Sequence, residues 1–280
     1  MKNEKMKTRL ALLDMNQGHE NQGMRCIRDI VSHFDSEIEL TELDVRVTNE
    51  VPGLDFDIYI SSGGPGNPLE GNGIWEKRFT NLLDKVWAFN KNPDTPKEAK
   101  KHFFFICHSF QLACNHFGLG DITKRKSTSF GVLPVHKTED GKNDFLFSSL
   151  NDPYTVIDSR DWQLIQPRLK VFKENGAKIL SLEKIRTHVE LERAIMAVRF
   201  SDEMVGTQFH PEADPKGMFE HFKKEDNRKK VIDNFNLRKY EQMMDALEDQ
   251  EKLARTHRTI LPRFIENALI QIRKNELQTI

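Results

Sequence analysis

Apolar and polar residues alternate along the first part of the chain with two different periods. Short, almost wholly apolar runs are typical of strands that a parallel sheet buries on both faces. Between these runs, apolar residues recur every three or four positions, which is the spacing of a helix that buries one face. The pattern predicts strands at residues 10–13, 38–45, 56–60 and 103–106, and helices at residues 24–34, 74–89 and 110–117.

From residue 130 onward the pattern changes to strands that are joined by loops and turns. Strands are predicted at residues 132–135, 154–158, 178–182, 194–200 and 205–209. Strands that alternate with helices over the preceding part of a chain indicate an α/β fold. We therefore expect a mostly parallel central sheet flanked by helices.

After residue 222 the sequence becomes highly charged, and its apolar residues gather on helical faces. Leu261, Phe264 and Ile265 share one such face with the apolar residues at positions 268, 269 and 272. Helices are predicted at residues 226–253 and 261–277, as an extension that packs on the rest of the chain or on a second subunit in a homodimer. The expected domains are residues 1–222 and residues 223–280.

Composition and charge exclude several functional classes. The 42 basic residues are balanced by 43 acidic ones, so the chain lacks the basic excess that binds nucleic acid or an anionic membrane. No apolar run approaches the ~20 residues of a membrane helix, and no apolar secretion signal follows the polar N-terminus. Three cysteines without a Cys-x-x-Cys pair predict neither a disulfide framework nor a zinc site. We expect a cytoplasmic protein that needs no metal and no cofactor.

Cys107 follows the apolar run at residues 103–106 and precedes a predicted helix. A cysteine at such a strand-to-helix turn would stand at the carboxyl edge of the sheet, as the nucleophile does in nucleophile-elbow enzymes. The N-terminus of the following helix would favour the thiolate, which is the reactive form. The plainer interpretation is a buried small hydrophobe, because cysteine packs well in apolar cores. The position of Cys107 alone does not decide between the two.

His210 is the second candidate, because it ends a predicted strand and is followed by Pro211 and Glu212. Residues two apart in an extended chain point to the same side, and the proline keeps the chain extended. A carboxylate beside an imidazole fixes the tautomer of the ring and stabilises its protonated form, as in a catalytic triad. A surface turn after an edge strand is the alternative interpretation of these residues.

The third candidate is a glycine-rich loop, SSGGPG, at residues 61–66. Glycines allow backbone N–H groups to approach an anion closely. Beside a reactive cysteine, the N–H groups of Gly64 and His108 would stabilise the oxyanion of a tetrahedral intermediate. A nucleotide-phosphate loop is a weaker interpretation, because the third glycine of the dinucleotide pattern and the Lys-Ser/Thr ending of a Walker loop are missing.

In this order, the three segments resemble the class-I glutamine amidotransferase family, especially the amidotransferase part of GMP synthase. SSGGPG resembles the oxyanion loop of the family, ICHSFQLA its nucleophile segment and VGTQFHPE its triad segment, and the similarity covers about residues 8–222. The resemblance implies that Cys107 is the nucleophile, His210 its base and Glu212 the group that orients the base. It also implies substrate contacts at Gly63, Gln111, Ser129 and Phe130, the last two in the segment SFGVLPV.

The sequence departs from the pattern of the family near the nucleophile. The family usually has glycine two residues before and two residues after the cysteine, where this chain has Phe105 and Ser109. Small residues relieve crowding at a strained turn, so Phe105 is the less expected of the two. Arg160 stands where many relatives have a histidine after a strand, which predicts a change in the pocket or in a partner surface.

The resemblance implies a glutaminase reaction. The Cys107 thiolate would form a thioester with glutamine, ammonia would leave with a proton from His210, and water would then release glutamate. Relatives pass the ammonia to a synthetase domain or subunit, and the residues after 222 are too few and too helical to form one. Two alternatives stay open: a cysteine hydrolase of γ-glutamyl amides or peptides, and a catalytically silent binding or regulatory module, which the departures at Phe105 and Ser109 suggest.

Overall fold

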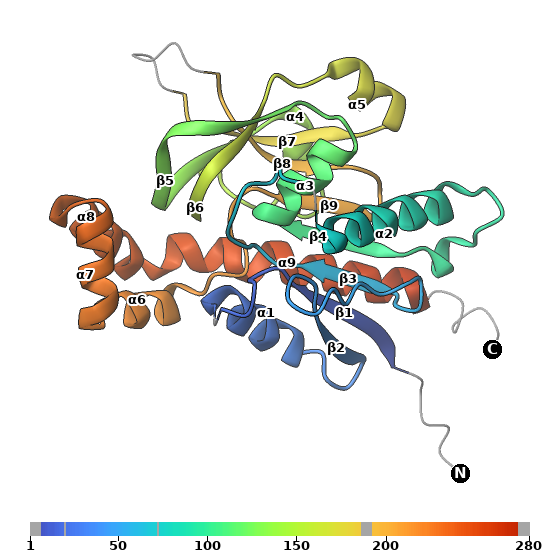
Figure 1. Ribbon diagram of the computed structural model, residues 1–280, viewed down its shortest axis with the longest axis horizontal. Coiled ribbons are helices and arrows are strands. Elements are labelled where there is room, and N and C mark those ends of the chain that lie inside the picture. The colour runs from blue at the N-terminus through green and yellow to red at the C-terminus, as the bar shows by residue number, and fades with distance from the viewer. Residues whose placement is uncertain (1–6, 20, 72, 186–191, 274–280) are drawn as a thin grey trace.

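A computed structural model describes residues 7–19, 21–71, 73–185 and 192–273 of the chain (Figure 1). In this part of the chain, nine strands form one sheet in the order β2-β1-β3-β4-β9-β8-β7-β5-β6. The strands are β1 (Thr8–Asp14), β2 (Ile38–Asp44), β3 (Ile58–Ser61), β4 (His102–Ile106), β5 (Asp121–Lys137), β6 (Tyr154–Ile165), β7 (Lys178–Glu183), β8 (Ile195–Arg199) and β9 (Met204–Thr207).

The sheet has a parallel half and an antiparallel half. Strands β2, β1, β3, β4 and β9 pair in parallel. From β9 onward, β8, β7, β5 and β6 pair antiparallel. The α/β fold with a central sheet between helices is confirmed, and the sheet is mixed because β5 to β8 add an antiparallel half to the parallel strands.

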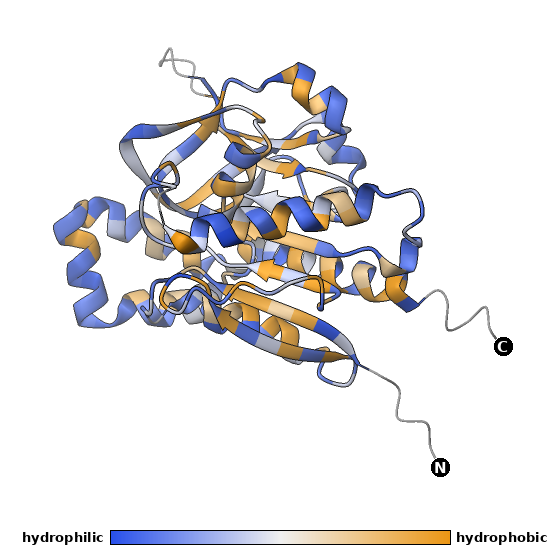
Figure 2. Ribbon diagram, turned by 45° about the vertical axis from the view of Figure 1, so that its right-hand side comes forward, coloured by the Kyte–Doolittle hydropathy of each residue, from blue (hydrophilic) through white to orange (hydrophobic). Residues whose placement is uncertain are grey.

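Helices cover both faces of the parallel half. α1 (Gln22–Ser32) and α9 (Gln250–Arg273) pack on one face, and α2 (Ile74–Lys91) and α3 (His108–His116) pack on the other. In β4, Phe104 and Ile106 point to the first face and Phe103 and Phe105 to the second, as the two-residue period of a strand requires. Figure 2 shows hydrophobic residues on the central strands and hydrophilic residues on the outer surfaces of the helices.

Short helices occupy the rest of the described chain. They are the 3₁₀ helix η1 (Lys97–Ala99), α4 (Glu139–Asn143), α5 (Leu169–Asn175), α6 (Pro215–Lys223), α7 (Glu225–Asn234) and α8 (Leu237–Glu248). The helical character of the C-terminal extension is confirmed, but the prediction of two helices at residues 226–253 and 261–277 is wrong in number. Four helices, α6 to α9, lie between Pro215 and Arg273, and residues 274–277 fall outside the described residues.

α9 continues through residues 254–260, which separate the two predicted helices, and contains Pro262 in its interior. A proline there removes one backbone hydrogen bond and costs about 3 kcal/mol or more. Leu253 lies on one side of the proline and Leu261 and Phe264 lie around it, all three buried. Burial of these side chains against the sheet offsets the loss, because each contributes roughly 1.5–3 kcal/mol.

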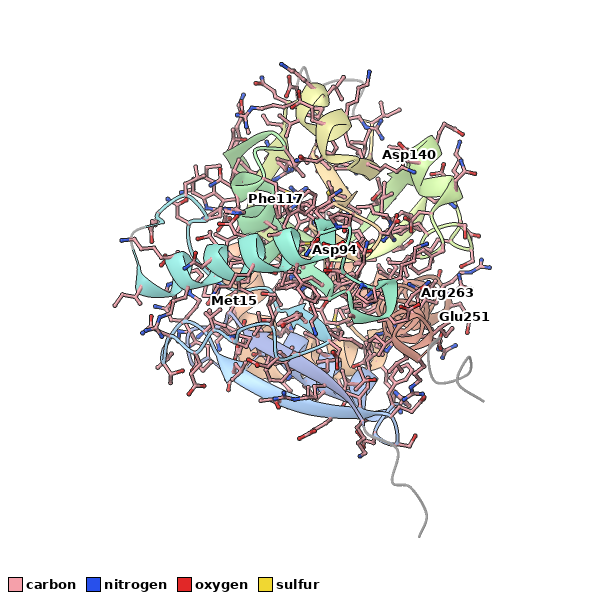
Figure 3. The ribbon with its side chains drawn as sticks, turned by 90° about the vertical axis from the view of Figure 1, so that its right-hand side faces the viewer. Met15, Asp94, Phe117, Asp140, Glu251 and Arg263 are labelled. Carbon is pink, nitrogen blue, oxygen red and sulfur yellow. The ribbon has the colours of Figure 1, made fainter. Side chains whose placement is uncertain are left out.

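The two parts of the helical extension lie differently on the molecule. α9 runs along the sheet, whereas α6, α7 and α8 project beside the ends of β5 and β6 (Figure 1). Figure 3 shows Glu251 and Arg263 on the outer side of α9, away from the sheet. The domain boundary at residue 222 stays a prediction, since packing of α9 on the sheet does not by itself define a domain.

Candidate active site

Cys107 forms the turn between β4 and α3. Its backbone has φ 50° and ψ −100°, a conformation that residues other than glycine rarely adopt. Its sulfur lies 3.8 Å from the carbonyl oxygen of Ser159 and 3.8 Å from Nε2 of Gln208. The side chain lines a cavity of about 1030 Å³ at the carboxyl edge of the parallel strands. This turn therefore holds the sulfur at the cavity wall in a strained backbone conformation.

The hydroxyl of Ser109 stabilises this turn. Ser109 is fully buried, and its Oγ accepts a hydrogen bond from the N–H of Ile106 at 2.9 Å. The same hydroxyl lies 2.9 Å from the carbonyl oxygen of Ser61, to which it donates. A glycine at position 109 would make neither bond, so the serine adds a connection between β4 and the end of β3.

Phe105 is accommodated by a glycine on the neighbouring strand. Its ring is buried and stacks on Phe103, with ring centroids 4.2 Å apart. Gly206 of β9 pairs with Phe105 in register, and a Cβ on Gly206 would come within 2.9 Å of the Cβ of Phe105. Gly206 on the neighbouring strand therefore provides the space for a large side chain at position 105. Phe105 and Ser109 are both compatible with the turn.

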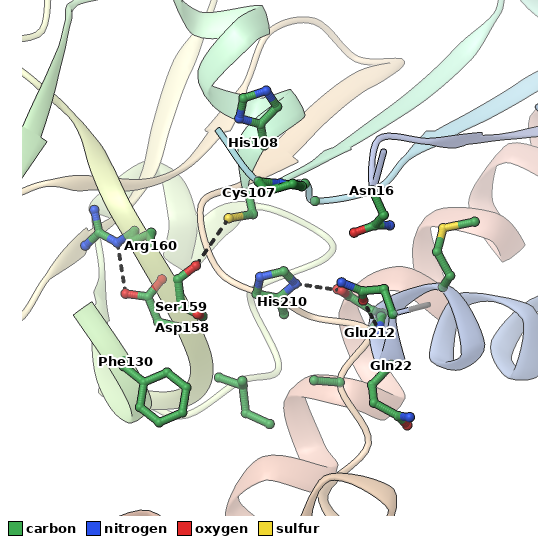
Figure 4. Close-up of a pocket in the computed structure, with 18 of the residues that line it drawn as sticks. Asn16, Gln22, Cys107, His108, Phe130, Asp158, Ser159, Arg160, His210 and Glu212 are labelled. Atoms are coloured by element: carbon green, nitrogen blue, oxygen red, sulfur yellow. Dashed lines mark hydrogen bonds and ion pairs between the residues drawn. The ribbon is translucent and has the colours of Figure 1, made fainter. Parts of the chain in front are cut away.

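His210 and Glu212 interact directly at the end of β9. Nδ1 of His210 lies 2.8 Å from Oε1 of Glu212, whose side chain is only 1% exposed (Figure 4). The backbone N–H of His210 donates to the carbonyl oxygen of Ile157 at 2.9 Å, which fixes the segment against β6. The bond between Nδ1 and the Glu212 carboxylate orients the ring of His210. The other ring nitrogen, Nε2, is then the one that can exchange a proton inside the cavity.

Gly63 allows the sulfur and the imidazole to approach each other. A Cβ at position 63 would lie 2.8 Å from Cε1 of His210 and 3.3 Å from the Cβ of Cys107. A side chain there would displace both residues. Gly64 is restricted by another contact, because its Cβ would lie 2.1 Å from the carbonyl oxygen of Met15. The glycine pair is therefore a steric requirement of the site.

The pKa of His210 is raised well above its usual value. Burial has the largest individual effect and lowers the pKa, but the charges of Glu212 and Cys107, and the hydrogen bonds to both, together outweigh it. The protonated imidazole is thus favoured between the carboxylate and the sulfur. This is the arrangement that an acid–base group needs beside a cysteine nucleophile.

The ring of His108 is held in its neutral form. Burial, with a smaller contribution from the charge of Arg46, lowers the pKa of His108 to about 3, so the ring is neutral. The ring lies 6.4 Å from that of Trp75, centroid to centroid. His108 opens α3, where backbone N–H groups have no partner within the helix. His108 and Gly64 both line the cavity with Cys107.

Gln111 is connected to the sulfur through a residue that the sequence patterns did not single out. Nε2 of Gln111 donates to the carbonyl oxygen of Trp162 at 3.1 Å and to Oε1 of Gln208 at 3.0 Å. Gln208 in turn directs its amide at the Cys107 sulfur. The signal was present in the sequence, because Gln208 precedes His210 by two positions on an extended segment.

Ser129 and Phe130 lie together on β5 but face different surroundings. The Ser129 hydroxyl donates to Oδ2 of Asp158 at 2.7 Å, and the same oxygen is 2.9 Å from Nε of Arg160. Asp158 and Arg160 are both buried, so Arg160 forms part of the cavity wall with its charge paired. The Phe130 ring stacks on Phe235, with centroids 4.7 Å apart, and so contacts the helical extension.

The described residues contain no group of three or more histidine, cysteine, aspartate or glutamate side chains that could hold a metal ion. None of the helices in the described part of the chain is long and apolar enough to cross a membrane. Cys26 and Cys114 are buried and free, and burial raises the pKa of Cys26 to about 12 and also raises that of Cys114.

The chain is similar in sequence to one protein family and in fold to several solved structures. The model of the family glutamine amidotransferase class-I matches residues 19–226. A glutamine amidotransferase from Thermotoga maritima is 19% identical, with a TM-score of 0.65 over 94% of this chain and 99% of that one. A glutamine amidotransferase from Methylobacillus flagellatus is 14% identical, with a TM-score of 0.62 over 96% and 94% of the two chains.

A more distant structure is the glutaminase domain of Trypanosoma brucei CTPS with bound acivicin. It is 13% identical, with a TM-score of 0.52, and the match covers 74% of this chain and 86% of that one. No curated protein matches the sequence. At these identities the solved structures support the fold, and the family model supports the family.

Proposed function

Since the chain belongs to the class-I glutamine amidotransferase family, we propose that it hydrolyses glutamine to glutamate and ammonia through a thioester on Cys107. The observation that carries the proposal is the hydrogen bond between His210 and Glu212 beside the Cys107 sulfur in one cavity. A strained cysteine at a helix N-terminus, an imidazole and a buried carboxylate are the parts of a cysteine hydrolase.

In the first half of the reaction, the Cys107 thiolate attacks the side-chain carbonyl carbon of glutamine. The negative charge that develops on the carbonyl oxygen is stabilised by the N–H groups of Gly64 and His108. The carbon–nitrogen bond then breaks, and His210 gives its proton to the leaving ammonia. Glu212 holds the ring in the orientation that this transfer requires.

In the second half, His210 takes a proton from water, which attacks the thioester. The carbon–sulfur bond breaks, glutamate leaves, and the Cys107 thiolate is restored. The proposed substrate contacts are Gly63 and Gln111 near the sulfur and the Ser129–Phe130 backbone on β5. The hydrogen bond from Ser129 to Asp158 supports the last of these, because it joins β5 to β6 beside the cavity.

For the ammonia that leaves, we propose either transfer to a synthetase partner of the GMP synthase kind or release to solvent. Measurement of ammonia transfer would need that partner, whereas glutamine hydrolysis can be measured on the isolated chain.

The proposal is tested by incubating the purified protein with glutamine and measuring ammonia. Acivicin, the ligand of the Trypanosoma glutaminase domain, serves as an affinity label, with the modified residue located by mass spectrometry. We expect ammonia release and labelling of Cys107 alone, because Cys26 and Cys114 have raised pKa values. Cys107→Ala should lower turnover by roughly 10⁴-fold or more.

Cys114→Ala is the matched control, because Cys114 lies on α3 but is fully buried in the core. This variant should keep its turnover. If no ammonia appears and Cys107 stays unlabelled while a known amidotransferase reacts, the glutaminase proposal fails and a silent binding module takes its place.

A further inference from the structure

The cavity at Cys107 is much larger than glutamine requires. Its volume of about 1030 Å³ lies at the upper end of the ~300–1,000 Å³ range of pockets that enclose drug-sized ligands. Glutamine is far smaller than such ligands. Part of the cavity therefore remains for a group that free glutamine does not carry.

The region beyond His210 is apolar, and we name it the apolar lobe. Strands β5 and β6 form one side of it, and helices α6 and α8 form the other. It is lined by Val132, Ile157, Met218, Phe222, Met243 and Leu247. The same residues belong to one hydrophobic cluster, in which Ile157, Met243 and Leu247 are buried. Figure 4 shows Phe130 on the side of the cavity opposite His108, and Phe130 packs against the same hydrophobic cluster.

The apolar lobe adjoins the backbone of His210. Ile157 accepts the backbone hydrogen bond of His210 at 2.9 Å, and Val132 pairs with Ile157 in the β5–β6 register. α6 begins soon after Glu212 and brings Met218 to the lobe from the other side. His210 and the lobe line the same cavity, so a substituent on the leaving nitrogen can reach the lobe.

The side of the cavity next to α1 is polar, and its two arginines are paired. Arg25 contacts Asp214 at 2.5 Å, and Arg28 contacts Glu42 at 2.7 Å. The first pair joins α1 to the N-cap of α6 at the border of the lobe, whereas the lobe itself is lined by aliphatic, aromatic and methionine side chains. Methionine adapts its shape to different apolar groups. The lobe is thus suited to an uncharged, apolar substituent of variable shape.

We propose that the enzyme also hydrolyses γ-glutamyl amides whose nitrogen carries an apolar substituent, which occupies the apolar lobe; this rests on the proposed function. The Cys107 thiolate forms the thioester, the carbon–nitrogen bond breaks, and the substituted amine leaves with the proton of His210. Water then attacks the thioester, so that γ-glutamyl amide and water give glutamate and a free amine. Atoms and charges balance without any further reactant.

The test compares three substrates: glutamine, γ-glutamyl-ethylamide and γ-glutamyl-phenethylamide. The two substituted amides release primary alkylamines of similar chemistry, so the difference between them reports the fit of the substituent. We expect kcat/KM for the phenethylamide to exceed that for the ethylamide by about tenfold or more, since each buried methylene contributes roughly 10–200-fold. This comparison uses the unaltered chain and does not depend on any variant.

Variants of α6 then locate the effect. Met218→Glu should lower the ratio of phenethylamide to ethylamide activity by about tenfold, because it puts a charge in the lobe. Met218→Leu should keep the ratio, and so should the control Glu220→Gln, since Glu220 is on α6 but exposed. A general loss of active protein lowers both activities equally, so it does not change the ratio.

The outcomes separate this inference from the proposed function. Hydrolysis of glutamine without any preference for the phenethylamide over the ethylamide overturns the role of the lobe and leaves the glutaminase proposal standing. Absence of hydrolysis of all three substrates, with Cys107 unlabelled by acivicin, overturns both. A preference that Met218→Glu leaves unchanged also overturns the lobe, because the substituent must then bind elsewhere.

Discussion

The turn at Cys107 and the helix α9 both hold the candidate triad in place, but different interactions stabilise them. The turn combines a strained backbone with hydrogen bonds of the buried Ser109 hydroxyl. α9 packs apolar side chains such as Phe264 on the sheet, and Nδ1 of His257 donates to the carbonyl oxygen of Glu212 at 2.9 Å. Precise local geometry thus depends on the turn, whereas α9 supplies much of the stabilising burial.

Loss of apolar packing between α9 and the sheet should lower stability and leave turnover unchanged. Phe264 is 3% exposed, and its ring centroid lies 5.1 Å from that of Phe104 in β4. Phe264→Ala should lower the free energy of unfolding by about 3–5 kcal/mol, through lost burial and the cavity left behind. Denaturant unfolding measures the loss, and kcat is measured at a temperature where the variant is folded.

The control for this prediction is Ile270→Ala. Ile270 lies on the same helix but is 58% exposed, so its loss should change stability by less than about 0.5 kcal/mol. A large fall in kcat for folded Phe264→Ala would contradict the division of roles, because α9 would then control the chemistry as well.

A second prediction uses the opposite pKa shifts of two histidines. His102, buried under Phe264, has a pKa lowered to about 4 by burial, whereas the pKa of His210 is raised. His102 binds a proton more readily in the unfolded chain than in the folded one. The free energy of unfolding should therefore fall by on the order of 3 kcal/mol as the pH falls from about 6.5 to about 4. The stability that His210 contributes is fully present below about pH 6.5 and is lost as the pH rises through the raised pKa of His210.

Unfolding free energies measured across this pH range check both signs. His102→Leu should flatten the acid side of the profile, and His210→Asn should flatten the alkaline side. The Asn variant should also lose turnover, while the Leu variant keeps it. An unchanged acid slope in His102→Leu would show that other groups control acid stability.

A third prediction concerns the turn. Ser109→Ala removes the acceptor of the Ile106 N–H and the donor to Ser61, and leaves both backbone groups buried. Stability should fall by about 1–3 kcal/mol. Turnover should fall by roughly tenfold to a hundredfold, because a displacement of about 1 Å at a nucleophile has effects of that size. Ser109→Gly, the residue usual in the family, loses the same two hydrogen bonds, so its kcat should fall to a similar extent.

The sequence revealed the parallel half of the fold best. β4 was predicted at residues 103–106 and runs over His102–Ile106, because a strand covered on both faces is a continuous apolar run. β5 was predicted at residues 132–135 but runs over Asp121–Lys137. Its first part pairs with β6 alone and carries exposed polar residues such as Lys124 and Lys126, so hydrophobicity gave no signal there.

The candidate site shows a similar division. Cys107, His210 and Glu212 were singled out from local patterns, and the structure brings them into one cavity. His257 could not be found in this way. Its bond goes to a backbone carbonyl 45 positions away, and any residue at position 212 would offer that carbonyl. A contact to a backbone group cannot be predicted from the type of residue that carries the group.

His257 provides the fourth prediction, since it joins α9 to the backbone of Glu212. Burial lowers its pKa, so its neutral ring donates from Nδ1 to the Glu212 carbonyl oxygen. His257→Leu should lower stability by about 1 kcal/mol. It should also lower kcat by about threefold, because Glu212 loses one of the bonds that position it.

Thr256→Val is the matched control for this last change. The Thr256 hydroxyl donates to the carbonyl oxygen of Thr155 at 2.7 Å, on the same helix but away from the triad. Both variants should lose similar stability, whereas only His257→Leu should lower kcat and shift the pH profile of kcat/KM, which reports the His210–Glu212 pair. Equal kinetics in the two variants would mean that α9 stabilises the fold without positioning Glu212.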